Sequence, residues 1–178
     1  LLCAWFPGTA QQSTVIEATN TQDTAIFNNL IRKGRKIHYT NPDSAILYYS
    51  LVYDHPAVNR KNWQKGGKDL DPAFLEYVIR ALNYAGNIYY YDDQFNRSEY
   101  YYQRSLEMAQ IAGLSNYEAR AYFDIGYIRY VTNAYEEAEE LFERSGNLYD
   151  ETENTAGKFD ALHACGLTSR RLGKYEEA

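Results

Sequence analysis

The chain has 178 residues, with 24 Asp and Glu against 18 Lys and Arg, so its formal net charge is −6. This balance argues against a general nucleic-acid binder, which needs a surplus of Lys and Arg to neutralise phosphates. A mean hydropathy of −0.60 excludes a polytopic membrane protein. With 45% hydrophobic and 16% aromatic residues the chain is too apolar to be disordered, and we expect one folded domain.

The start of the chain resembles the end of a secretory signal peptide. Leu1 to Phe6 are apolar and uncharged, and the small residues Gly8 and Ala10 have the spacing that signal peptidase requires, which places the cut before Gln11. We therefore expect residues 1–10 to be a signal-peptide remnant and the mature protein to be exported, to the periplasm of a bacterium. An ordinary frayed terminus is the alternative.

Charge is distributed unevenly along the chain. Residues 1–70 carry 8 basic and 5 acidic side chains, whereas residues 71–178 carry 10 and 19. The densest basic run consists of Arg32, Lys33, Arg35 and Lys36, and the densest acidic run of Glu136, Glu137, Glu139, Glu140 and Glu143. Both runs are typical of solvated helix faces, because neither is interleaved with a motif that would concentrate the electric field of these charges on a ligand.

A repeat is visible further along the chain. Gly86, Gly126 and Gly166 are 40 residues apart, and each is followed nine residues later by an aromatic residue, the first being Phe95. Apolar and small residues flank these positions at helical spacing, so each unit is predicted to contain two amphipathic helices. The glycine of the first helix and a Ser or Ala of the second remove side-chain bulk, which allows the two backbones to cross closely.

These positions resemble the signature of the tetratricopeptide repeat, in a form with a 40-residue period where 34 is common. The matching residues of one unit are Leu82, Ala85, Gly86, Tyr89, Phe95, Ser98, Tyr102 and Ser105. Arg129 and Ser169 depart from the pattern, since they stand where Tyr89 does. Period-40 arrays are similar to those of bacterial regulators and peptide receptors. The resemblance implies an all-α fold, a right-handed superhelical array of antiparallel helix hairpins.

The repeat register divides the chain into units. Asn41-Pro42-Asp43 predicts a helix start in a degenerate first repeat, and Ser115 with Glu118 predicts a capping box in a later one. The expected segments are an N-terminal extension at 11–21, the degenerate repeat at 22–53, a loop or short helix at 54–70, repeats at 71–113 and 114–150, and an incomplete repeat at 151–178.

No catalytic or metal-binding pattern stands out. His163 and Cys165 are two residues apart on a predicted helix, so they point in different directions and cannot act as base and nucleophile together. His38 and His55 have no Cys or His at ligand spacing. The sequence therefore implies no cofactor and no metal, and an enzyme on a helical array is the least favoured interpretation.

The resemblance places ligand-facing residues on the first helices of successive units, where they line a concave groove. These residues are Arg80, Asn83, Asn87, Tyr90, Arg120, Phe123, Tyr127, Tyr130, His163 and Arg170. The two asparagines can pair with an extended peptide, and the three arginines suit a carboxylate or an acidic segment.

We therefore expect a non-catalytic scaffold that binds a protein or peptide, as the exported ligand-sensing part of a larger bacterial regulator. Nucleic acid is not an expected partner, and a membrane would be reached only through regions outside this sequence. The alternative is a docking or assembly scaffold that acts through the basic N-terminal third.

Overall fold

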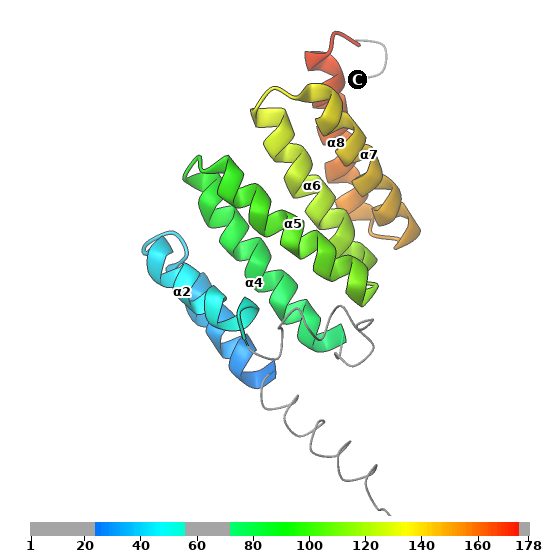
Figure 1. Cartoon of the computed structure of the whole chain (residues 1–178). Coiled ribbons are helices and arrows are strands. Elements are labelled where there is room, and N and C mark those ends of the chain that lie inside the picture. Colours follow the sequence, from blue (N-terminus) through cyan, green and yellow to red (C-terminus); the bar gives the residue numbers. More distant parts are fainter. Residues whose placement is uncertain (1–23, 56–71, 175–178) are drawn as a thin grey trace, which may run out of the picture.

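The computed structural model describes residues 24–55 and 72–174 of the chain, and within these ranges every regular element is a helix (Figure 1). A helix at residues 24–37 is followed by α2 (Pro42–Tyr53), α4 (Pro72–Tyr91), α5 (Phe95–Ala112), α6 (Ser115–Val131), α7 (Tyr135–Glu151) and α8 (Thr155–Arg171). The all-α array of helix hairpins predicted from the sequence is therefore present. The predicted signal peptide, the N-terminal extension and most of the predicted loop at 54–70 lie outside the described residues.

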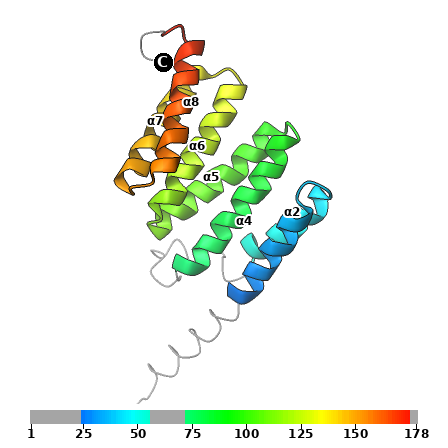
Figure 2. The same cartoon turned by 180° about the vertical axis from the view of Figure 1, so that it is seen from behind.

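The helices pair in chain order and the pairs stack side by side. The helix at 24–37 and α2 form the first hairpin, α4 and α5 the second, and α6 and α7 the third, with α8 packed on α7. The first helices also touch each other across the stack, α4 contacting α6 and α6 contacting α8. α7 lies in front of α8 in Figure 1 and behind it in Figure 2. None of the described helices is long and apolar enough to cross a membrane.

Close approach of the paired helices depends on glycines, as the repeat predicts. A Cβ added to Gly86 would lie 2.5 Å from Cε1 of Tyr102, and one added to Gly126 would lie 2.9 Å from Cε1 of Phe142. Both distances are below van der Waals contact, so the aromatic ring occupies the space that a side chain would need. The first hairpin has the same arrangement, with Gly34 against the ring of Tyr49 at 2.5 Å.

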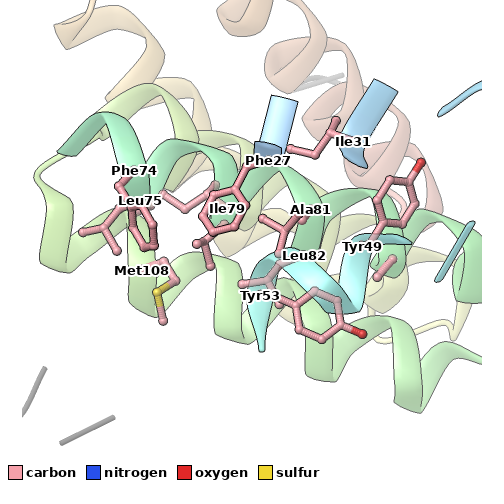
Figure 3. Packing of buried hydrophobic residues seen from close by; sticks show 14 of the residues in the cluster. Phe27, Ile31, Tyr49, Tyr53, Phe74, Leu75, Ile79, Ala81, Leu82 and Met108 are labelled. Atoms are coloured by element: carbon pink, nitrogen blue, oxygen red, sulfur yellow. The ribbon is translucent and has the colours of Figure 1, made fainter. Parts of the chain in front are cut away.

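The core is a series of clusters between neighbouring helices. The largest cluster joins the first hairpin to α4 and α5 (Figure 3), and it includes Phe27, Ile31, Tyr49, Phe74, Leu75, Ile79, Leu82 and Met108. A second cluster around Tyr102 and Ile125 joins α5 to α6, and a third around Phe142 and Ala164 joins α7 to α8. Each hairpin thus buries apolar side chains against its neighbours as well as between its own two helices.

Buried serines connect helices through backbone carbonyls. Ser98 Oγ donates to the carbonyl of Gly86 at 2.9 Å, which ties α5 to α4, and Ser145 Oγ donates to the carbonyl of Ala119 at 2.8 Å, which ties α7 to α6. Ser105 occupies the position equivalent to Ser145, but its buried hydroxyl has no hydrogen-bond partner. At this position the hydroxyl therefore forms a hydrogen bond in the third hairpin and none in the second.

Helix ends agree in part with the sequence. Asn41 caps α2 as predicted, its Oδ1 accepting from the Ser44 amide at 3.1 Å. The capping box predicted at Ser115 and Glu118 is wrong. α6 begins at Ser115 itself, no side chain caps it, and Glu118 Oε1 instead accepts from Gln110 Nε2 at 3.0 Å.

Candidate functional site

A pocket opens between α4 and α6, on the side of the array where the first helices meet. Its volume is about 350 Å³. We call it the α4–α6 pocket, and its lining residues are Asn87, Tyr90 and Tyr91 of α4, Tyr102 of α5, and Arg120, Phe123, Asp124 and Tyr127 of α6.

An ion pair forms the polar floor of the α4–α6 pocket. Arg120 Nε donates to Asp124 Oδ2 at 2.9 Å, one helical turn along α6. The side chain of Asp124 is 8% exposed and that of Arg120 is 49% exposed. Burial raises the pKa of the Asp124 carboxyl, against the attraction of the neighbouring guanidinium. The two terminal nitrogens of Arg120 have no acceptor among the described residues, so they can donate to a ligand.

Aromatic rings form the walls of the pocket. The Arg120 guanidinium lies over the ring of Phe123, 5.5 Å from its centroid. Tyr127 of α6 stands edge-on to Tyr90 of α4, with 6.2 Å between ring centroids. The ring centroid of Tyr127 also lies 5.8 Å from that of Phe123. The walls therefore offer apolar faces next to a hydrogen-bonding cation.

Asn87 contributes a second donor. Its Oδ1 accepts a hydrogen bond from the Tyr102 hydroxyl at 2.6 Å, which leaves its amide nitrogen without an acceptor among the described residues. Burial, and secondarily the nearby Asp124, raises the pKa of Tyr102, so this hydroxyl keeps its proton as donor. With Arg120 and Asn87 both presenting N–H groups, the pocket suits a carboxylate or carbonyl oxygen beside an apolar group.

Comparison with known families identifies the part of the chain that holds this pocket. Residues 77–151, from α4 to the end of α7, match the sequence model of the tetratricopeptide repeat. These residues are tetratricopeptide repeats. Such repeats generally mediate protein–protein interactions and are typically non-catalytic scaffolds. No match was found among curated proteins. The 40-residue type of repeat remains a prediction.

The repeat array brings together half of the predicted ligand-facing residues. Five of the ten line the α4–α6 pocket, namely Asn87, Tyr90, Arg120, Phe123 and Tyr127. Tyr130 lies beside this group, 6.1 Å from Tyr127 between ring centroids, and accepts a hydrogen bond from Arg171 at 3.3 Å.

The other four predicted residues of the repeats lie outside the pocket. Arg80 faces Glu76 at 3.9 Å and lies over the ring of Tyr77. Asn83 has a buried Oδ1 without a hydrogen-bond partner. His163 and Arg170 are exposed on α8. The three arginines predicted to recur along the groove are therefore not gathered in one pocket, and Arg120 is the one that lines it.

Sequence reasoning missed three of the lining residues, Tyr91, Tyr102 and Asp124. Asp124 was detectable, because it follows Arg120 by four residues on a predicted helix, the spacing at which opposite charges pair. Tyr102 was expected only as a position of the repeat signature. Among the described residues, no three His, Cys, Asp or Glu side chains gather as a metal site would require.

Proposed function

We propose that the α4–α6 pocket is the centre of a peptide-binding groove, and that it takes a partner segment in which a carboxylate lies beside an aromatic or large apolar side chain. The observation that carries this proposal is the Arg120 guanidinium, held by Asp124 with its terminal nitrogens free. A guanidinium of this kind binds carboxylates with two parallel hydrogen bonds.

Orientation of Arg120 before binding favours recognition. An exposed arginine loses side-chain freedom when it binds a ligand, and this loss weakens the complex. The bond from Arg120 Nε to Asp124 and the stacking on Phe123 already restrict the side chain in the free protein. Asp124 is therefore a positioning residue, and Arg120 is the residue that contacts the ligand.

The size of the pocket favours a short linear segment. About 350 Å³ lies at the lower end of the range of small-ligand sites, which is enough for one or two side chains. The amide nitrogen of Asn87 can bind a backbone carbonyl of the same segment. A protein partner would thus present an extended or exposed segment to the repeats.

The first experiment selects ligands without assuming their identity. A phage-displayed library of random 12-residue peptides is selected on the purified chain, and enriched peptides are measured by fluorescence anisotropy. We expect enrichment of Asp or Glu next to an aromatic or large apolar residue. Arg120→Gln should weaken binding by about tenfold to a hundredfold, the range for hydrogen bonds to charged groups.

The matched control is Arg144→Gln, which removes an exposed arginine of α7 that lies over the ring of Tyr122, outside the pocket and outside the predicted groove. Peptides that bind the Arg120→Gln and Arg144→Gln variants equally well would refute the proposal. A second variant replaces the four basic residues Arg32, Lys33, Arg35 and Lys36 with glutamine. If this variant loses peptide binding while Arg120→Gln binds normally, the docking scaffold is supported instead.

We further propose that the protein is exported and serves as the non-catalytic, ligand-sensing part of a larger bacterial regulator. The apolar start of the sequence with its small residues before Gln11 supports export, and the likeness to period-40 arrays supports the regulator. Mass spectrometry of the N-terminus of the natural gene product in its own host tests export. A mature protein that begins at Gln11 is expected, and an uncleaved cytosolic protein would refute it.

A further inference from the structure

A second pocket lies where the first hairpin meets the end of α4, and no sequence motif pointed to it. Its volume is about 430 Å³. Its walls come from the turn between the first two helices and the start of α2, at residues 38–46, and from the end of α4, the turn that follows it and the start of α5, at residues 88–97. We call it the tyrosine pocket.

The tyrosine pocket carries an excess of negative charge. Asp43 and Asp92 line it, and neither forms an ion pair with any described residue. The cation in the lining, Arg97, is already engaged, because it donates to Gln94 Oε1 at 2.9 Å and lies over the ring of Tyr89 at 5.5 Å. The Gln94 amide in turn donates to Asp92. The Asp43 carboxylate has no such bond.

Aromatic rings stand exposed at the same pocket. Tyr39 is 79% exposed and Tyr91 is 67% exposed, and they meet edge-on with 6.0 Å between centroids. A ring face next to a carboxylate attracts a cation in two ways, through the negative face of the ring and through the charge. Exposed aromatics grouped in a pocket also mark interaction sites more often than isolated ones do.

We propose that the tyrosine pocket takes the basic side chain of a lysine or arginine. The cation would lie over the face of Tyr39 or Tyr91 and pair with Asp43 or Asp92. The alkyl part of the side chain would cover the rings, as long basic side chains do on apolar surfaces.

The two pockets share a wall. Tyr91 lines both of them, and the neighbouring Tyr90 of the α4–α6 pocket lies 5.6 Å from it between ring centroids. A peptide that places a carboxylate on Arg120 can therefore continue past Tyr91 into the tyrosine pocket. The recognised segment would then carry one acidic and one basic residue. This continuation rests on the proposed function, whereas the cation site does not.

The test uses a small probe, so that no natural ligand is needed. N-acetyl-lysine methylamide is titrated into the isotope-labelled chain and the tyrosine ring resonances are followed by NMR, with N-acetyl-norleucine methylamide as the uncharged analogue. We expect saturable shifts at Tyr39 and Tyr91 with the lysine probe and smaller, non-saturating shifts with the norleucine probe. Equal shifts with both probes, or none at either tyrosine, would overturn the proposal.

Charge variants complete the test. The double variant Asp43→Asn, Asp92→Asn should bind the lysine probe at least about threefold more weakly, as expected for exposed charge pairs and cation–π contacts. Asp160→Asn, which removes an exposed carboxylate of α8, should have no effect, and unchanged affinity in the double variant would refute the cation site. Arg120→Gln should leave the affinity for the lysine probe unchanged. If peptides bind in an Arg120-dependent way but the lysine probe does not bind, this inference is refuted while the proposed function stands.

Discussion

Replacement of Gly86 by alanine tests the close approach of paired helices, on which the array depends. The new Cβ would lie 2.5 Å from Cε1 and 2.7 Å from Cδ1 of Tyr102. The ring cannot easily move away, because Tyr102 is 3% exposed and its hydroxyl is bonded to Asn87. Overpacking of this kind costs about 1–3 kcal/mol.

Alanine also favours the helix over glycine by about 1 kcal/mol, so the cost of the contact must be separated from this gain. Gly146 on α7 provides the control, since a Cβ there would meet Ala161 Cβ at 3.6 Å, an ordinary contact. We expect Gly146→Ala to stabilise the protein by about 1 kcal/mol, and Gly86→Ala to destabilise it by up to about 2 kcal/mol after the helix gain is subtracted.

Urea unfolding followed by circular dichroism at 222 nm measures both variants. The informative quantity is the difference between the two changes in unfolding free energy, which should be about 1–3 kcal/mol. In a chain of this length each kcal/mol shifts Tm by about 2–4 °C. Equal stabilisation by the two alanines would show that the glycine is not required for helix crossing.

Other substitutions test other features of the fold. Ser145→Ala should lower the free energy of unfolding by about 1 kcal/mol, because it removes the buried hydrogen bond to the carbonyl of Ala119. Ser105→Ala should be neutral or stabilising, because that hydroxyl is unpaired. Chemical denaturation measures both variants, and a similar loss of stability in each would contradict the reasoning. Glu153 has a φ of +56°, so Glu153→Gly should raise stability by about 1 kcal/mol in the same assay, and a loss would show that its side chain matters more than its backbone. Burial, with a contribution from a nearby arginine, lowers the pKa of His38 from its ordinary value of 6.5. Below about pH 6.5 the unfolded chain therefore binds a proton that the folded chain does not, and stability should fall as the pH decreases. His38→Gln should reduce this slope in thermal melts recorded between pH 5 and 8, and an unchanged slope would exclude His38 as its source.

The hairpins could be predicted from the sequence because their determinants are local. Gly86 and Gly126 each face an aromatic residue 16 positions later, and both ends of that contact repeat at the same interval. The helix register then fixes which side chains share a face, so Asn87 and Arg120 could be placed on the same side without coordinates.

The parts that could not be predicted depend on how hairpins pack together. Gly34 precedes Gly86 by 52 residues, whereas Gly86 precedes Gly126 by 40, so the register of the later repeats does not extend to the first hairpin. The tyrosine pocket lies at this irregular junction. The burial of Asp124 was missed for a related reason, since a carboxylate on an amphipathic helix is normally solvated, and here neighbouring helices bring Tyr90 and Tyr102 close to it.

The walls of the α4–α6 pocket come from two hairpins, and this gives the array a mechanical property. Any bending that changes the angle between the second and third hairpins also changes the width of the pocket. Occupancy and curvature are thus linked in both directions, so a bound segment would stiffen the array, and a pull that opens the stack would release the segment.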